Sequence, residues 1–223
     1  GKPPPVGDPQ EPPQGYLVQD EWRALLEQAI AQDADAGWAS WLHLGLMRHA
    51  AGEPAAARAA WQRSLDHTPT RWATRNLAAL ARVQGQPDQA AALYLDACRL
   101  LPSLLPLAVE CGQTLIEAGR AQEWLDLLPE LSDEVRQAGR VRLLEGQAAL
   151  DTQDFGRVER LFADAPEVSD LREGERSLSQ LWFEYHERRL AALKGIPIDD
   201  DLRARVRAEF PVPPEIDFRM SPD

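Results

Sequence analysis

Cysteine is scarce in this sequence, and long apolar runs are missing from it. Two cysteines among 223 residues are too few for the disulfide framework of a small secreted domain. We expect Cys98 and Cys111 to be ordinary buried residues in a reducing compartment. No apolar run approaches the roughly 20 residues that span a bilayer, and no signal-like segment lies near the start. These absences predict a cytoplasmic protein.

Positive charge is also in deficit. Lysine and arginine number 24 against 36 aspartates and glutamates, which leaves a net charge of -12. A surface this acidic repels phosphate backbones and anionic lipids, so we expect neither nucleic acid nor a membrane as partner. Hydrophobic residues make up 44% of the chain, which is enough to bury a sizeable core.

Strand-like alternation is nearly absent, and apolar residues recur at steps of three and four, as in Trp38, Trp41, Leu42 and Leu46. This spacing predicts helices. The prolines of residues 1–15 block helix propagation, so that segment is expected to be extended or disordered. We expect a helical repeat domain over 16–194. A last section, 195–223, holds one further helix, capped by the aspartates at 199–201, and a proline-broken tail.

A 33-residue repeat organises the helical part. Eight positions match at this offset: Leu44 with Leu77, Gly45 with Ala78, Gly52 with Gly85, Pro54 with Pro87, Ala57 with Ala90, Trp61 with Tyr94, Ser64 with Ala97, and Pro69 with Pro102. Such self-similarity is typical of a helical solenoid. The glycines fit left-handed helix ends, and Pro54 and Pro87 fit the first turn of the next helix.

Weaker copies follow at a step of 34. The third contains Gly112, Gly119 and Leu128, and the fourth contains Gly146, Val158 and Phe162. In the third copy Trp124 falls at a small-residue position, and Pro129 is expected to cut the second helix short. We predict a lone helix at 20–32, helix pairs at about 38–70, 71–103, 105–131 and 137–165, and a capping helix at 170–193.

The first copy resembles the tetratricopeptide repeat in its residue types and spacing: Trp41, Leu44, Gly45, Ala57, Trp61, Ser64 and Pro69. The resemblance implies an all-α, right-handed superhelix of antiparallel helix pairs, with a concave groove that binds proteins. The groove residues would be His43, Trp72, Arg75, Asn76, Arg82, Arg140 and Gln147, with Leu143 beside them. Together with Arg71, these arginines would suit a carboxylate or a backbone amide. The alternative is that these residues only solvate a face of the protein or pair with nearby glutamates and aspartates.

A second resemblance rests on three short motifs. They are Trp72 with Arg75 to Ala78, Leu171 to Glu175 with Leu181 to Phe183, and Asp217 to Met220. They resemble the C-terminal helical part of large bacterial proteins in which an uncharacterised β-rich domain, suggestive of carbohydrate-active folds, precedes the repeats. This resemblance implies that the chain is one end of a longer polypeptide, which the initial Gly1 fits.

The sequence also predicts a docking surface for a partner domain, formed by Arg172, Glu173, Glu175, Trp182 and Phe218. For the segment Arg172 to Glu175, the alternative is a capped helix start. On the capping helix, Glu187, Arg188 and Arg189 are expected to face water. In the tail, Ile216, Phe218 and Met220 alternate, and we expect them to pack on a surface.

No residue pattern indicates chemistry. His186 has no second ligand cluster, and His43 and His49 lack the i, i+4 spacing of metal ligands. We expect no metal, no cofactor and no catalytic residue in the isolated chain. The leading hypothesis is an interaction module that binds a protein or a neighbouring domain. The alternatives are an accessory domain of a carbohydrate-active enzyme, or a scaffold that recognises peptide termini through Arg75.

Overall fold

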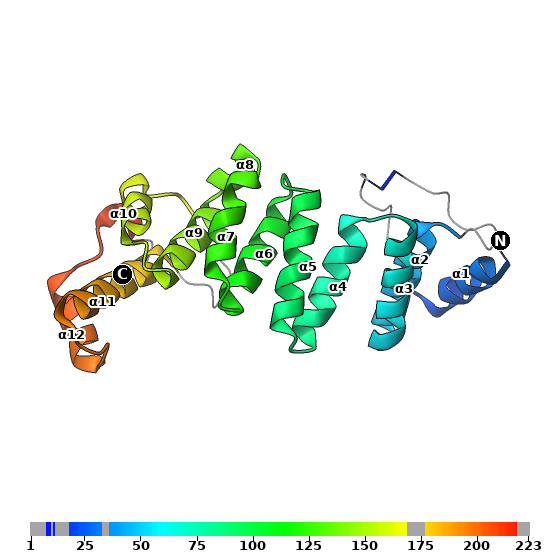
Figure 1. Ribbon diagram of the computed structural model, residues 1–223, viewed down its shortest axis with the longest axis horizontal. Coiled ribbons are helices and arrows are strands. Elements are labelled where there is room, and N and C mark those ends of the chain that lie inside the picture. Colours follow the sequence, from blue (N-terminus) through cyan, green and yellow to red (C-terminus); the bar gives the residue numbers. More distant parts are fainter. Residues whose placement is uncertain (1–7, 10, 12–17, 33–35, 169–176, 218–223) are drawn as a thin grey trace, which may run out of the picture. The chain divides into compact units, whose positions relative to one another are not determined.

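The structure, a computed structural model, describes residues 8, 9, 11, 18–32, 36–168 and 177–217. The described residues form helices and connecting turns, and no strand occurs among them. The chain divides into an N-terminal unit, Gly1–Pro102, and a C-terminal unit, Ser103–Asp223. Figure 1 labels their helices. The predicted all-α helical repeat fold is confirmed.

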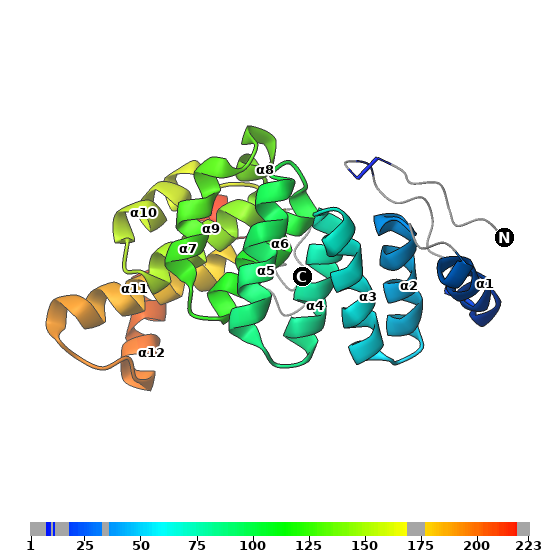
Figure 2. The same ribbon diagram turned by 45° about the vertical axis from the view of Figure 1, so that its right-hand side comes forward.

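The N-terminal unit contains five helices: α1 (Asp20–Gln32), α2 (Trp38–Ala50), α3 (Pro54–His67), α4 (Arg71–Val83) and α5 (Pro87–Leu100). Helix α2 packs against α3, and α4 packs against α5, so each predicted repeat is one antiparallel pair. Helix α3 joins the two pairs by packing on α4, and α1 covers α2. Figure 2 shows the pairs side by side from a second direction.

The ends of these helices follow from the repeated glycines and prolines. Gly52 and Gly85 have positive φ angles of 75° and 68°, a conformation that costs a residue with a Cβ atom about 1–2 kcal/mol. Pro54 and Pro87 occupy the first turn of α3 and α5, where the missing N–H has no helical partner to lose. Both predicted roles are confirmed.

The interior of the first pair is built on a large residue facing a small one. A Cβ atom at Gly45 would overlap the indole ring of Trp61. The Trp61 Nε1–H donates to the Leu42 carbonyl oxygen at 3.2 Å, and the Ser64 hydroxyl donates to the Trp38 carbonyl oxygen at 2.8 Å. The matched repeat positions therefore place a ring and a hydroxyl that tie α3 to the backbone of α2.

The C-terminal unit is less regular. It contains α6 (Leu105–Glu117), α7 (Ala121–Leu127), α8 (Asp133–Gln137), α9 (Gly139–Asp151), α10 (Phe155–Asp164), α11 (Leu178–Lys194) and α12 (Asp200–Glu209), with 3-10 turns at Leu128–Glu130 and Pro214–Ile216. Helix α9 packs against α6, α7, α10 and α11. The predicted early end of the second helix before Pro129 is confirmed, because α7 has seven residues.

The large residues that face the glycines of this unit do not lie at the 34-residue step. The side chain nearest to Gly112 is Trp124, with ring carbons 2.9 Å from where a Cβ atom would lie, and not Leu128. Helix α7 ends before Leu128, so the ring that fills the gap comes from one turn earlier. Gly146 likewise faces Leu161 instead of Phe162. Phe162 packs edge-on to Trp182, with ring centroids 5.0 Å apart.

The capping helix α11 is not the outer layer of the unit, because α12 packs against it. The prediction that Glu187 faces water is therefore wrong: the residue is only 8% exposed. The predicted N-cap Asp199 accepts a hydrogen bond from the Leu202 N–H at 2.9 Å. Among the described residues, no helix is both long and apolar enough to cross a membrane.

The described part of the tail packs on this unit as predicted. Ile216 is buried in a cluster with Leu143, Leu178 and Leu181. The Ser179 hydroxyl donates to the Ile216 carbonyl oxygen at 3.2 Å. Phe218 and Met220 lie outside the described residues.

Candidate functional site

A polar and aromatic surface covers the first two turns of α4 in the N-terminal unit. It consists of Arg71, Trp72, Arg75 and Asn76, and we call it the α4 face. Thr70 starts the helix here, because its hydroxyl oxygen accepts a hydrogen bond from the Ala73 N–H at 3.4 Å. Arg71 is buried, and the other three residues are half-buried. The sequence predicted all four as groove residues.

Within this face, Arg71 and Trp72 form a stacked pair. The Arg71 guanidinium carbon lies 4.4 Å from the centroid of the Trp72 ring. Only 5% of Arg71 is exposed, and burial lowers the pKa of its guanidinium. A stacked and desolvated guanidinium interacts with an anion more strongly than one in open water.

The chain's own N-terminal segment contacts this face through an acidic turn formed by Asp8, Pro9 and Glu11. The Glu11 N–H donates to the Asp8 carbonyl oxygen at 3.0 Å, which closes the turn. The Trp72 Nε1–H donates to the Glu11 carbonyl oxygen at 3.1 Å. The negative charge of Asp8 raises the pKa of Arg71 and so opposes the effect of burial. The α4 face thus holds a backbone carbonyl and lies near a carboxylate.

The other predicted groove residues are placed differently. His43 on α2 is half-buried, and burial lowers the pKa of its imidazole. Arg82 is exposed in the last turn of α4. Arg140 and Gln147 lie on α9, in the C-terminal unit. Gln147 is only 8% exposed, so it does not offer the open amide that a groove wall needs.

Most of the predicted docking surface lies outside the described residues, namely Arg172, Glu173, Glu175 and Phe218. Trp182 is described and half-buried. Its Nε1–H donates to the Phe210 carbonyl oxygen at 3.1 Å. This tryptophan therefore joins the segment after α12 to α11, and its docking role stays a prediction.

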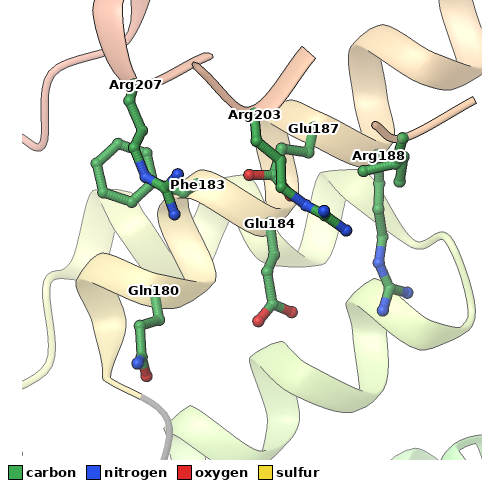
Figure 3. Close-up of a pocket in the computed structure, with 8 residues that line it drawn as sticks. Gln180, Phe183, Glu184, Glu187, Arg188, Arg203 and Arg207 are labelled. Carbon is green, nitrogen blue, oxygen red and sulfur yellow. The ribbon is translucent and has the colours of Figure 1, made fainter. Parts of the chain in front are cut away.

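A cavity of about 600 Å³ lies between α11 and α12 (Figure 3), and the sequence did not predict it. Its lining is Gln180, Phe183, Glu184, Glu187, Arg188, Ile198, Arg203 and Arg207. The α11 residues follow helical steps of three and four, and the two α12 arginines are one turn apart. This spacing shows in the sequence that the residues of each helix share one face. The two faces enclose a cavity only because α12 folds back on α11.

The charges of this α11–α12 cavity are unequally paired. Arg188 is held by the Leu150 carbonyl oxygen and by Asp151, both at 2.9 Å. Glu187 has one ion-pair partner among the described residues, Arg203, with 4.0 Å between the carboxylate oxygen and Nε. Burial raises the pKa of Glu187. The Arg207 guanidinium lies over the Phe183 ring, 5.8 Å from its centroid.

A smaller cavity of about 280 Å³ adjoins α7, α8 and α9. Its one carboxylate, Glu145, pairs with Arg157 at 2.9 Å and with Arg142 at 3.6 Å. The charges inside it are therefore satisfied by the protein itself. No group of three potential metal ligands occurs in the described ranges.

Comparison with solved structures identifies the type of fold. No family model matches the sequence, and no curated protein matches it. Among solved structures, a tetratricopeptide repeat protein from Parabacteroides merdae is similar. Its TM-score is 0.54 at 17% identity, over 83% of this chain and 78% of that chain. At this identity the likeness shows the fold alone. The chain therefore has a tetratricopeptide-like, all-α helical repeat fold.

Proposed function

We propose that the N-terminal unit is a protein-interaction module whose α4 face binds a short acidic segment of a partner protein. The observation that carries this proposal is the contact between Trp72 and Glu11. A surface that holds an acidic turn of its own chain has the donors and the charge needed for a similar turn of another chain. Helical repeats of this kind commonly present such surfaces to proteins.

The chemistry of the α4 face favours an acidic partner segment. Arg71 and Arg75 offer guanidinium groups, which suit carboxylates by charge and by fork geometry. The indole N–H of Trp72 supplies a neutral donor for a backbone carbonyl. Because the whole chain carries a net charge of -12, this local positive charge is needed to overcome the repulsion of an acidic partner.

The acidic turn would compete with the partner. A segment tethered to the same unit acts at an effective concentration on the order of millimolar. A partner peptide must outcompete this tethered segment, so removing the electrostatic attraction between Asp8 and Arg71 should raise the apparent affinity for an added peptide.

The test uses the full chain and a fluorescent synthetic peptide with the sequence of residues 3–14. Anisotropy should report tighter peptide binding to Asp8→Lys than to the unaltered chain. Adding Trp72→Phe to Asp8→Lys removes one donor, and about 0.5–1.5 kcal/mol of binding free energy should be lost, which is roughly 2–10-fold in affinity.

The matched control is Trp41→Phe, because Trp41 also carries a stacked arginine, Arg63, at 5.5 Å. That change should leave peptide affinity unaltered. Equal losses for the two tryptophans, or no peptide binding to Asp8→Lys, would show that the α4 face is not the binding surface. The carbohydrate-enzyme alternative depends on Arg172, Glu173 and Glu175, and no described residue favours it over the interaction module.

A further inference from the structure

The α11–α12 cavity holds a buried carboxylate that lacks a hydrogen bond. Glu187 is 8% exposed, and its carboxylate makes no hydrogen bond in the part of the chain that the structure describes. The 4.0 Å to Arg203 exceeds hydrogen-bond distance. A buried carboxylate in this state is costly, so a ligand that donates hydrogen bonds to it gains more than it would at a solvated one.

An arginine at the opposite side of the cavity also lacks an ion-pair partner. Arg207 is exposed and makes no ion pair within the described ranges. Its neighbour Arg203 pairs with Asp200 at 2.9 Å, but the Asp200 side chain is 97% exposed. Exposed pairs of this kind contribute little, so Arg203 can exchange Asp200 for a ligand carboxylate at small cost.

The Glu187 carboxylate and the Arg207 guanidinium line the same cavity, beside apolar surface. Arg203 and Arg207 both act electrostatically on Glu187, and Figure 3 shows them reaching from α12 toward α11. Phe183 and Ile198 line the same cavity. A ligand that satisfies both groups must therefore carry a positive and a negative charge next to an apolar group.

Ligands of a single charge fit less well. A cation would meet three arginines in the lining, and an anion would meet Glu184 and Glu187. A zwitterion satisfies both signs at once. The volume of about 600 Å³ lies in the ordinary range of small-molecule sites, which is roughly 300–1,000 Å³.

We propose that the α11–α12 cavity binds a free α-amino acid with an apolar side chain. Its ammonium group donates to the Glu187 carboxylate, and its carboxylate accepts from Arg207 and Arg203. Its side chain packs against Phe183 and Ile198. Both helices belong to the C-terminal unit, so this inference does not depend on the function proposed for the α4 face.

Titration calorimetry on the full chain tests this with three probes: L-leucine, N-acetyl-L-leucine and L-leucinamide. L-leucine should bind. The acetylated probe lacks the cation and the amide lacks the anion, so each should bind about tenfold more weakly or worse, in line with the strength of charge-assisted hydrogen bonds. No heat with L-leucine, or equal binding of all three probes, would overturn the proposal.

Variants locate the site. Glu187→Gln and Arg207→Gln should each weaken L-leucine binding by about tenfold or more. Arg205→Gln is the matched control, since Arg205 lies on α12 outside the cavity and pairs with Glu209 at 3.0 Å. It should bind L-leucine as the unaltered chain does. If Glu187→Gln fails to fold, Arg207→Gln provides the test, because Arg207 is exposed and its replacement should not disturb folding. Unchanged L-leucine binding to Arg207→Gln would refute the site.

Discussion

At the scale of single residues, the helix ends of successive pairs use one backbone conformation. Gly52, Gly85 and Gly119 all have positive φ angles near 70°. The corresponding residue after α9 is Gln153, whose φ is 61°. Because glutamine carries a Cβ atom, the fourth pair has a strained residue where the other pairs have a glycine.

Replacing this residue should relieve the strain. We expect Gln153→Gly to stabilise the C-terminal unit by about 0.5–1 kcal/mol, since the lost strain outweighs the extra entropy of glycine in the unfolded chain. Urea denaturation followed by circular dichroism measures this. Gln137→Gly, at an exposed helical residue without positive φ, should instead be destabilising. Equal effects of the two changes would contradict this explanation.

The contact between Gly45 and Trp61 gives a second prediction. Gly45→Leu forces a side chain into the indole ring and should cost about 1–3 kcal/mol of unfolding free energy. Gly156→Ala is the control, because the nearest atom to its added Cβ lies at 3.8 Å. Calorimetric melting should place the Gly45 variant well below the unaltered chain and the Gly156 variant near or above it.

A histidine in the C-terminal unit gives a pH dependence. His186 stacks on Phe210 with the ring centroids 4.0 Å apart. It packs edge-on to Trp182 with the ring centroids 4.4 Å apart. Burial, with a smaller effect of Arg189, lowers its pKa to about 4. Between pH 6.5 and 4 the unfolded chain therefore binds a proton that the folded chain does not, and stability falls as the pH falls through this range.

The expected loss from this histidine is on the order of 2–3 kcal/mol across the range. His186→Phe keeps an aromatic ring and removes the proton site, so its stability should fall less between pH 6.5 and 4. The control His67→Phe alters an exposed histidine at the end of α3 and should follow the unaltered chain. Identical pH profiles for His186→Phe and the unaltered chain would rule out this cause.

At the scale of elements, the first two pairs and the two C-terminal helices could be predicted from the sequence, but the packing of α12 on α11 could not. Glycine and proline act locally, so Gly52 and Pro54 mark a helix end and a helix start without reference to the rest of the chain. Whether Glu187 meets water depends on where α12 lies, 13 residues further along. Pro129 predicts the early end of α7, but which side chain then faces Gly112 depends on how the shortened helix packs.

The candidate sites likewise contain parts that could be predicted from the sequence and parts that could not. The α4 face was predictable, because Arg71, Trp72, Arg75 and Asn76 share one side of a single helix by spacing alone. The acidic turn on that face was not predicted, since contacts made by a proline-rich segment leave no periodic signal. The α11–α12 cavity was missed because it needs two helices to meet.

The position of Glu187 under α12 gives an element-scale prediction. Burial raises the pKa of Glu187, so the folded chain holds the proton of this carboxyl more tightly than the unfolded chain does. The free energy of unfolding therefore falls as the pH rises through the raised pKa. Glu187→Gln mimics the protonated form. It should therefore raise the unfolding free energy at pH 7, and the difference should vanish as the pH falls below 4.5. Glu209→Gln, at an exposed carboxylate on α12, should show no such pH-dependent gain.

At the scale of the whole molecule, the two units carry different surfaces. The N-terminal unit has regular helix pairs and the α4 face, which holds the acidic turn. The C-terminal unit has irregular pairs, an added layer of α12, and a cavity lined by the buried carboxylate of Glu187 and the exposed Arg207. Regular repeats thus accompany the α4 face, and the departure from the repeat accompanies the α11–α12 cavity.

The proposed interaction depends on a hydrogen bond from the Trp72 Nε1–H on the α4 face to an acidic segment. Its most direct measurement is the 15N–1H spectrum of the indole groups in full-length Asp8→Lys, with Trp72 identified by its loss in Trp72→Phe. On addition of the peptide of residues 3–14, the Trp72 Nε1–H signal should move and saturate, while the Trp41 signal stays in place. A Trp72 signal that does not move under a saturating excess of peptide would contradict the account.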